Sequence, residues 1–144
     1  MKRNELKNEL KKYEDLTNFG SSDDSPGFEW IGKAEKELGI ILPDDYKWFL
    51  NEYGGGEICG EEIYSIYCMP FNEAVGGDLV YQNTIANKNI SLGKLVLSNT
   101  DFGEEFYFKV SDLKKVYVKI GDREEVYAES FIGYVHKRLV SYLK

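Results

Sequence analysis

Apolar side chains recur at helical spacing in the first third of the chain. Residues 3–16 carry one such stripe among lysines and glutamates, and residues 28–38 carry a second. Between them, residues 18–27 are mostly Ser, Asp, Gly and Pro, a composition typical of a loop. We therefore expect an N-terminal helix and linker over residues 1–26 and a folded domain over residues 27–144.

The clearest helix is predicted to begin at Pro43. Proline suits a first helical turn because it needs no N–H partner there, and the two aspartates that follow place negative charge at the positive end of the helix dipole. Apolar side chains then recur at Tyr46, Phe49, Leu50 and Tyr53. We interpret the glycines at 54–56 as the end of this helix. A phosphate-binding loop would need a lysine where Glu57 follows.

After residue 57 the pattern becomes that of short strands. A hairpin is predicted to turn near Gly60, residues 71–86 fit a helix interrupted by two glycines, and Ser130 is predicted to cap a last helix. Further β-rich runs cover residues 95–97, 106–110, 116–120 and 126–128. This order predicts one α+β domain, with an antiparallel sheet of about four to six strands and helices packed on one side.

Composition and charge exclude several classes of function. The 144 residues include 25 Asp and Glu against 18 Lys and Arg, a net charge of −7. An acidic domain is repelled by phosphate backbones, so nucleic acid is not an expected partner. The chain has no apolar run of the ~18 residues that a membrane helix needs. It also lacks a secretory signal, and we expect a cytoplasmic protein with no membrane partner.

The negative charge is unevenly distributed along the chain. Residues 48–87 contain no Lys or Arg, and aromatic side chains lie among their carboxylates. The acidic residues of this stretch are Glu52, Glu57, Glu61, Glu62, Glu73 and Asp78. Such a pattern is typical of a surface for a basic protein partner, where charge steers encounter and aromatic rings anchor contact. A solvated acidic face is the alternative interpretation.

Residues that could carry chemistry are few. The sequence pattern identifies no nucleophile as a partner of the single histidine, His136, so we interpret this residue as structural. Cys59 and Cys68 are interpreted as reduced, small hydrophobic residues, with a disulfide between them as the alternative. Two cysteines without a neighbouring histidine cannot form a zinc site. We therefore predict no catalytic residue, no metal and no cofactor.

Paired carboxylates are the remaining candidates for chemistry. The pairs are Glu61–Glu62, Glu104–Glu105 with Asp101 nearby, and Glu124–Glu125. Adjacent carboxylates on a strand point to opposite faces, and the chain has no calcium-loop pattern. We interpret these residues as surface or partner-facing charge, and a carboxylate-based hydrolase as the least favoured alternative.

Residues 35–56 resemble the signature of the SUKH immunity-protein superfamily. In that superfamily a Leu-Pro-x-x-Tyr/Phe-x-x-Phe-Leu helix leads into a Gly-Gly turn and a strand. The matching residues here are Leu42-Pro43, Tyr46, Phe49-Leu50 and Gly54-Gly55. The resemblance covers about residues 27–143, and the founding members of the superfamily are fungal cell-wall glucan-synthesis and killer-toxin-resistance regulators.

The resemblance implies a single α+β domain without known catalysis. Bacterial members are similar to immunity proteins that bind and block a cognate polymorphic toxin, frequently a nuclease. The expected partner is then a basic toxin protein, and a cell-wall or signalling adaptor is the alternative function. The residues that we predict to bind the partner are Glu57, Glu61, Glu62, Tyr64, Asp101, Glu104 and Glu105.

Overall fold

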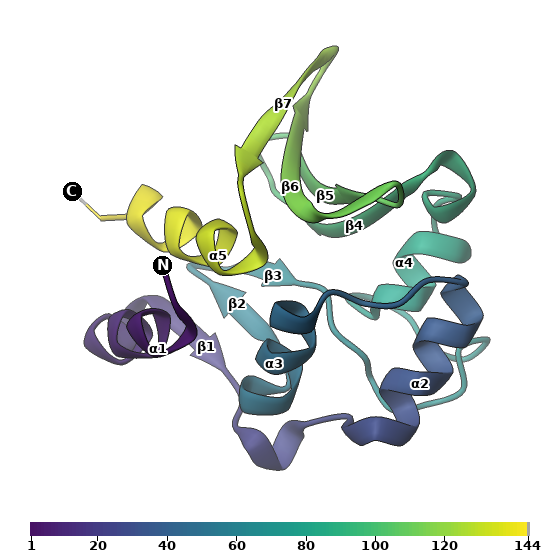
Figure 1. The fold of residues 1–144 in the computed structure, drawn as a ribbon, viewed down its shortest axis with the longest axis horizontal. Coiled ribbons are helices and arrows are strands. Elements are labelled where there is room, and N and C mark those ends of the chain that lie inside the picture. The colour runs from purple at the N-terminus through teal and green to yellow at the C-terminus, as the bar shows by residue number, and fades with distance from the viewer. Residues whose placement is uncertain (144) are drawn as a thin grey trace.

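A computed structural model describes residues 1–143 (Figure 1). Its helices are α1 (Arg3–Lys12), α2 (Gly27–Leu38), α3 (Asp44–Tyr53), α4 (Leu79–Thr84) and α5 (Phe131–Ser141). Short 3-10 turns are η1 (Glu14–Leu16), η2 (Ser22–Asp24) and η3 (Ile90–Leu92). The strands are β1 (Thr17–Phe19), β2 (Gly56–Ile58), β3 (Glu61–Ile63), β4 (Lys94–Asn99), β5 (Glu104–Lys109), β6 (Asp112–Ile120) and β7 (Arg123–Ala128).

The strands form a small sheet of order β1-β2-β3 and a large sheet of order β4-β5-β6-β7, and every strand pair is antiparallel. The two sheets meet where β3 ends. The Tyr64 amide donates to the Leu97 carbonyl at 2.7 Å, and the Ser98 hydroxyl donates to the Glu62 carbonyl at 2.6 Å. These bonds hold the end of β3 beside β4, so the surface of the small sheet continues onto that of the large sheet.

The α+β class and the antiparallel arrangement predicted from the sequence are confirmed. The predicted ends of the third helix and the start of the last are also confirmed. Gly54 ends α3 in the left-handed conformation with φ 73°, and the Ser130 side chain accepts a hydrogen bond from the Gly133 amide. The strands differ from the expectation in being divided between two sheets.

Two strand boundaries differ from the prediction because tertiary pairing overrides loop composition. β1 lies partly in the predicted linker, where Asn18 pairs with Glu57 across the small sheet. β6 begins at Asp112, inside a predicted connection, and pairs with β5 through a register shift after Phe108. Neither Thr17–Phe19 nor residues 112–115 have the alternating apolar pattern of a strand, so neither stretch could be recognised locally.

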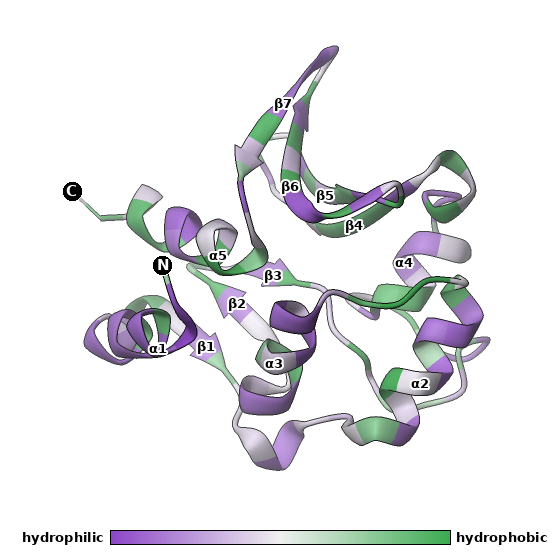
Figure 2. Ribbon diagram, in the orientation of Figure 1, coloured by the Kyte–Doolittle hydropathy of each residue, from purple (hydrophilic) through white to green (hydrophobic). Residues whose placement is uncertain are grey.

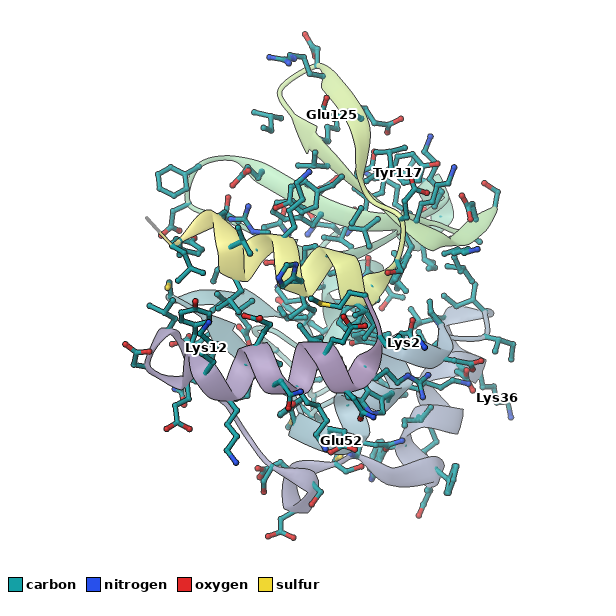
Figure 3. The ribbon with its side chains drawn as sticks, turned by 60° about the vertical axis from the view of Figure 1, so that its left-hand side comes forward. Lys2, Lys12, Lys36, Glu52, Tyr117 and Glu125 are labelled. Atoms are coloured by element: carbon teal, nitrogen blue, oxygen red, sulfur yellow. The ribbon has the colours of Figure 1, made fainter. Side chains whose placement is uncertain are left out.

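The core lies between the inner faces of the sheets and the helices. Phe106 of β5 and Phe131 of α5 are both buried and both contact the ring of Tyr134, at centroid distances of 5.3 and 5.8 Å. The β6–β7 hairpin projects beyond this core (Figure 1), and its end is hydrophilic (Figure 2). Tyr117 lies on the same hairpin, and Glu125 lies towards its end (Figure 3).

The N-terminal helix contributes to this core. Leu6 and Leu10, the apolar stripe of α1, are buried. Figure 3 shows α1 beside α5, with Lys2 and Lys12 at opposite ends of α1, and the two helices are in contact. Burying two leucine side chains contributes about 1.5–3 kcal/mol each relative to leaving them exposed, which fixes α1 against the fold.

The predicted reduced state of the two cysteines agrees with the structure, whereas their interpretation as small hydrophobic residues does not. Cys59 and Cys68 are exposed and free. Both have left-handed backbones, with φ of 49° and 58°, because each lies where the chain turns. Burial of their sulfur atoms is only partial, and it is the main cause that raises the pKa of each thiol.

Candidate functional site: the outer face of the two sheets

Neighbouring carboxylates of the predicted binding set separate onto opposite faces of their strands. Glu61 and Glu104 turn to the interior, where both approach the guanidinium group of Arg138 on α5. Arg138 Nε donates to Glu61 Oε2 at 2.8 Å, its Nη2 donates to Glu61 Oε1, and Glu104 Oε1 lies 3.7 Å from Nη2. The Glu61 side chain is only 4% exposed. Its carboxylate therefore faces Arg138, and not the outer surface that we expected from the sequence.

Glu57 and Glu62 lie on the opposite, outer face. They face each other across β2 and β3, and Asn18 of β1 continues the same row. Glu62 is exposed and Glu57 half-buried, and neither forms an ion pair within residues 1–143. Two directly opposed and unpaired carboxylates repel each other, which costs stability in the absence of a cation.

Tyr64 and Glu105 extend this face onto the large sheet. The Asn99 side chain donates to the Tyr64 hydroxyl at 2.8 Å, and Asn99 pairs with Glu105 across β4 and β5. Burial raises the pKa of the Tyr64 hydroxyl, and the carboxylates of Glu62 and Glu105 raise this pKa further. We call Glu57, Glu62, Tyr64 and Glu105 the outer acidic face; of its carboxylates, Glu105 is neutralised by Lys94, whose Nζ lies 2.6 Å away.

The loop after β3 is fixed against Glu62. The Tyr67 hydroxyl donates to Glu62 Oε2 at 3.1 Å and accepts a hydrogen bond from the Gly77 amide at 2.8 Å. A Cβ atom at position 77 would lie 2.1 Å from Glu62 Oε2, so a side chain there would displace the end of the Glu62 side chain. Asp78 closes the loop by accepting from the amides of Tyr67 and Tyr81. The carboxylate of Glu62 is thus held in place while remaining exposed.

The helix of the signature supports the same face from beneath. Tyr46 of α3 is fully buried, and its hydroxyl donates to the main-chain carbonyl of Tyr64 at 2.7 Å. Burial raises the pKa of this phenol well above its usual value, so it remains a donor. The motif tyrosine therefore positions the strand end that carries Tyr64.

Replacing Tyr46 with phenylalanine is expected to lower the free energy of unfolding by about 1–3 kcal/mol, because the buried Tyr64 carbonyl loses its partner. Urea unfolding would measure the change. The matched control is Tyr53→Phe on the same helix, where the half-buried hydroxyl makes no hydrogen bond within residues 1–143. Equal losses in the two variants would contradict the role assigned to Tyr46.

Asp101 lies apart from the outer acidic face, exposed in the turn between β4 and β5. The structure therefore brings together Glu57, Glu62, Tyr64 and Glu105, while Glu61 and Glu104 lie beneath them and Asp101 lies at one edge. Tyr64 is 8% exposed and supports the face more than it projects from it.

Arg138 is the important residue that sequence reasoning missed. It follows Tyr134 by four positions and Val135 by three, so it lies on the apolar stripe of the last helix. A lone cation on an apolar stripe indicates a buried ion pair, and this signal was available in the sequence. The identity of its partner, Glu61, could not be predicted from the sequence, because the two residues are 77 positions apart.

No group of three or more His, Cys, Asp or Glu side chains within residues 1–143 has the arrangement of a metal site. His136 is half-buried on α5. Across the same described range, every helix is too short or too polar to cross a membrane.

The described fold and the motif around α3 agree with a comparison to known families. Residues 29–135 match the family described as SUKH_6, SMI1-KNR4 cell-wall. The matched region begins in α2 and ends in α5. It therefore includes α3, Glu61 and all four residues of the outer acidic face. A search of curated proteins found no match. Because the match covers well over half of the chain, this protein belongs to the SUKH_6 family of SMI1-KNR4 proteins.

Proposed function

We propose that this protein is a non-enzymatic immunity protein that binds and neutralises a cognate polymorphic toxin with a basic surface. The observation that supports the proposal is the pair Glu57 and Glu62, opposed on neighbouring strands and without a Lys or Arg partner in residues 1–143. A cation from another protein placed between them would remove their repulsion. Membership in the SUKH_6 family supports the same interpretation.

The expected toxin is a nuclease, because a nuclease needs a basic cleft to hold its nucleic acid. An acidic inhibitor can occupy or flank such a cleft, and complementary charge then increases the association rate. The protein would act in the cytoplasm by stoichiometric binding. Glu57 and Glu62 would guide the encounter, and Glu105, already paired with Lys94, would contribute less.

Co-expression tests the proposal directly. The toxin to use is the one encoded beside this protein, produced in a bacterial host whose growth it stops. We expect the wild-type protein to restore growth and to bind the purified toxin at a rate that decreases as salt increases. Absence of both rescue and binding would contradict the proposed function.

Charge-neutral variants test the assigned surface. The double variant Glu57→Gln, Glu62→Gln is expected to lower the association rate at low salt by about tenfold, because steering contributes roughly 10–10³-fold to such rates. The matched control is Glu37→Gln, Glu125→Gln, which removes the same charge from exposed positions on α2 and β7 that form no ion pair within residues 1–143. Equal losses in both double variants would indicate an effect of net charge alone.

A second candidate function is that of a regulatory adaptor in cell-wall synthesis. It is favoured by the description of the matching family as SMI1-KNR4 cell-wall. Gene neighbourhood distinguishes the two, since a large adjacent toxin gene favours immunity and a cell-wall operon favours regulation.

A further inference from the structure

The turn between β4 and β5 is a short and internally bonded hairpin loop. The Thr100 amide donates to the Glu104 carbonyl at 2.9 Å, and the Gly103 amide donates to the Thr100 carbonyl at 3.1 Å. The Glu104 amide also donates to the Thr100 hydroxyl at 3.3 Å. Gly103 has φ 81°, the left-handed conformation that lets the loop close. These bonds fix the backbone of the loop before any partner binds.

The rigid loop presents an acidic and an aromatic side chain at its tip. Asp101 is exposed, and Phe102 is 77% exposed. A phenylalanine left in water has a large apolar area available for burial by a partner. Because the backbone is already ordered, little conformational entropy is lost when such a ring is buried.

Beside the tip lies a hollow of about 260 Å³. One wall is the β2–β3 turn with Cys59 and Gly60, another is Tyr142 after the end of α5, and the tip supplies Asp101 and Phe102. Glu61 contributes to the lining, and the Tyr142 hydroxyl donates to Glu61 Oε1 at 3.3 Å.

The charge around this hollow is negative. Arg138 compensates the charge of Glu61, and Asp101 adds a carboxylate to the lining that forms no ion pair within residues 1–143. Among residues 1–143, the side chains that line the hollow include no lysine or arginine. A positively charged side chain entering it would therefore be attracted by Asp101.

We propose that the β4–β5 tip anchors a basic partner protein: Phe102 enters an apolar recess of that partner, and the hollow receives one of its arginine or lysine side chains, which pairs with Asp101. The inference rests on the proposed function and adds a second surface, besides the outer acidic face, that contacts the toxin. Asn99 connects the two surfaces, since it lines the hollow and donates to the hydroxyl of Tyr64 on the outer acidic face.

The two surfaces have different roles in this interpretation. Charges on the outer acidic face mainly change the association rate, whereas a buried aromatic anchor mainly changes the dissociation rate. Phe102→Ala is expected to raise the rate of dissociation from the toxin at least tenfold, an effect of roughly hot-spot size, with an association rate within about twofold of wild type. The matched control is Leu92→Ala, because Leu92 is 73% exposed on η3 and lies outside the tip.

A second measurement needs no toxin. We would titrate the isotope-labelled full chain with N-acetyl-arginine amide and follow the amide resonances of Gly60 and Gly103. Saturable shifts are expected there, with none at Gly121 of the β6–β7 turn, and the uncharged citrulline analogue should produce none. Asp101→Asn should abolish the shifts, while Asp122→Asn, an exposed aspartate in the β6–β7 turn, should retain them.

The outcomes separate the inference from the proposed function. If the wild-type protein neutralises the toxin but Phe102→Ala leaves dissociation unchanged, the anchor is overturned and the immunity function stands. If no toxin is bound, the immunity function fails, and the arginine titration alone then tests whether the hollow binds a cationic side chain. Equal shifts with arginine and citrulline, or equal shifts at Gly60 and Gly121, would overturn the cation site.

Discussion

Replacing Arg138 with methionine is expected to lower the free energy of unfolding by about 3–5 kcal/mol, the largest effect of any single change considered, because it leaves the buried carboxylate of Glu61 without its cation. Arg138 is 7% exposed and Glu61 is 4% exposed, so water cannot replace the lost partner. The guanidinium also lies 4.7 Å from the ring centroid of Phe106, and methionine preserves part of that packing. Urea unfolding at neutral pH would measure the loss.

The double variant Glu61→Met, Arg138→Met tests the cause of this loss. Removing both charges should recover part of the stability, since a buried pair replaced by apolar groups of similar size is often neutral. The matched control is Arg123→Met, at the exposed start of β7, for which a change within about 0.5 kcal/mol is expected. A double variant no more stable than Arg138→Met would indicate that lost packing is the cause.

Replacing Gly56 with alanine is expected to lower the free energy of unfolding by at least 2 kcal/mol, an order-of-magnitude value, because β1 and β2 must separate to admit the methyl group. A Cβ atom at this position would lie 2.2 Å from the Asn18 carbonyl oxygen and 2.6 Å from the Phe19 Cα. Both are backbone atoms, and Gly56 also has φ 143°, which side chains rarely adopt. We expect faster hydrogen exchange at the Cys59 amide, which donates to the Leu16 carbonyl at 2.8 Å.

The control for Gly56 separates close contact from backbone strain. Gly121 has φ 59°, but a Cβ atom there would have no neighbour within 4 Å. Gly121→Ala should therefore cost only the left-handed strain of about 1–2 kcal/mol and leave exchange at Cys59 unchanged. Similar exchange at Cys59 in the two alanine variants would show that β1 is not displaced.

The elements predicted correctly are those whose signals lie within a few residues. α3 has a proline and two aspartates at its start, an apolar stripe and a left-handed glycine at its end, and each of these acts over one or two helical turns. The hairpin of β2 and β3 is likewise local, with its turn at Cys59 and Gly60. Such signals are independent of the rest of the fold.

The elements that were missed depend on distant partners. β1 is a strand only because β2, almost forty residues further along, offers its edge, and the close approach is permitted by Gly56. The exposure of Cys59 and Cys68 has a similar cause, since both lie at turns whose positions are set by the strands around them. Composition alone indicated a linker and two small hydrophobic residues.

The candidate site shows the same division. The amino-acid order already establishes an acidic α+β protein of the SUKH type, and strand geometry requires that Glu61 and Glu62, like Glu104 and Glu105, point to opposite faces. That geometry cannot say which member of each pair points toward Arg138. The docking of α5 decides it, because α5 places Arg138 beneath one face of both strands and so draws Glu61 and Glu104 inward. Glu62 and Glu105 are left on the outer face, beside Glu57; Glu62 is exposed there, whereas Glu105 is paired with Lys94.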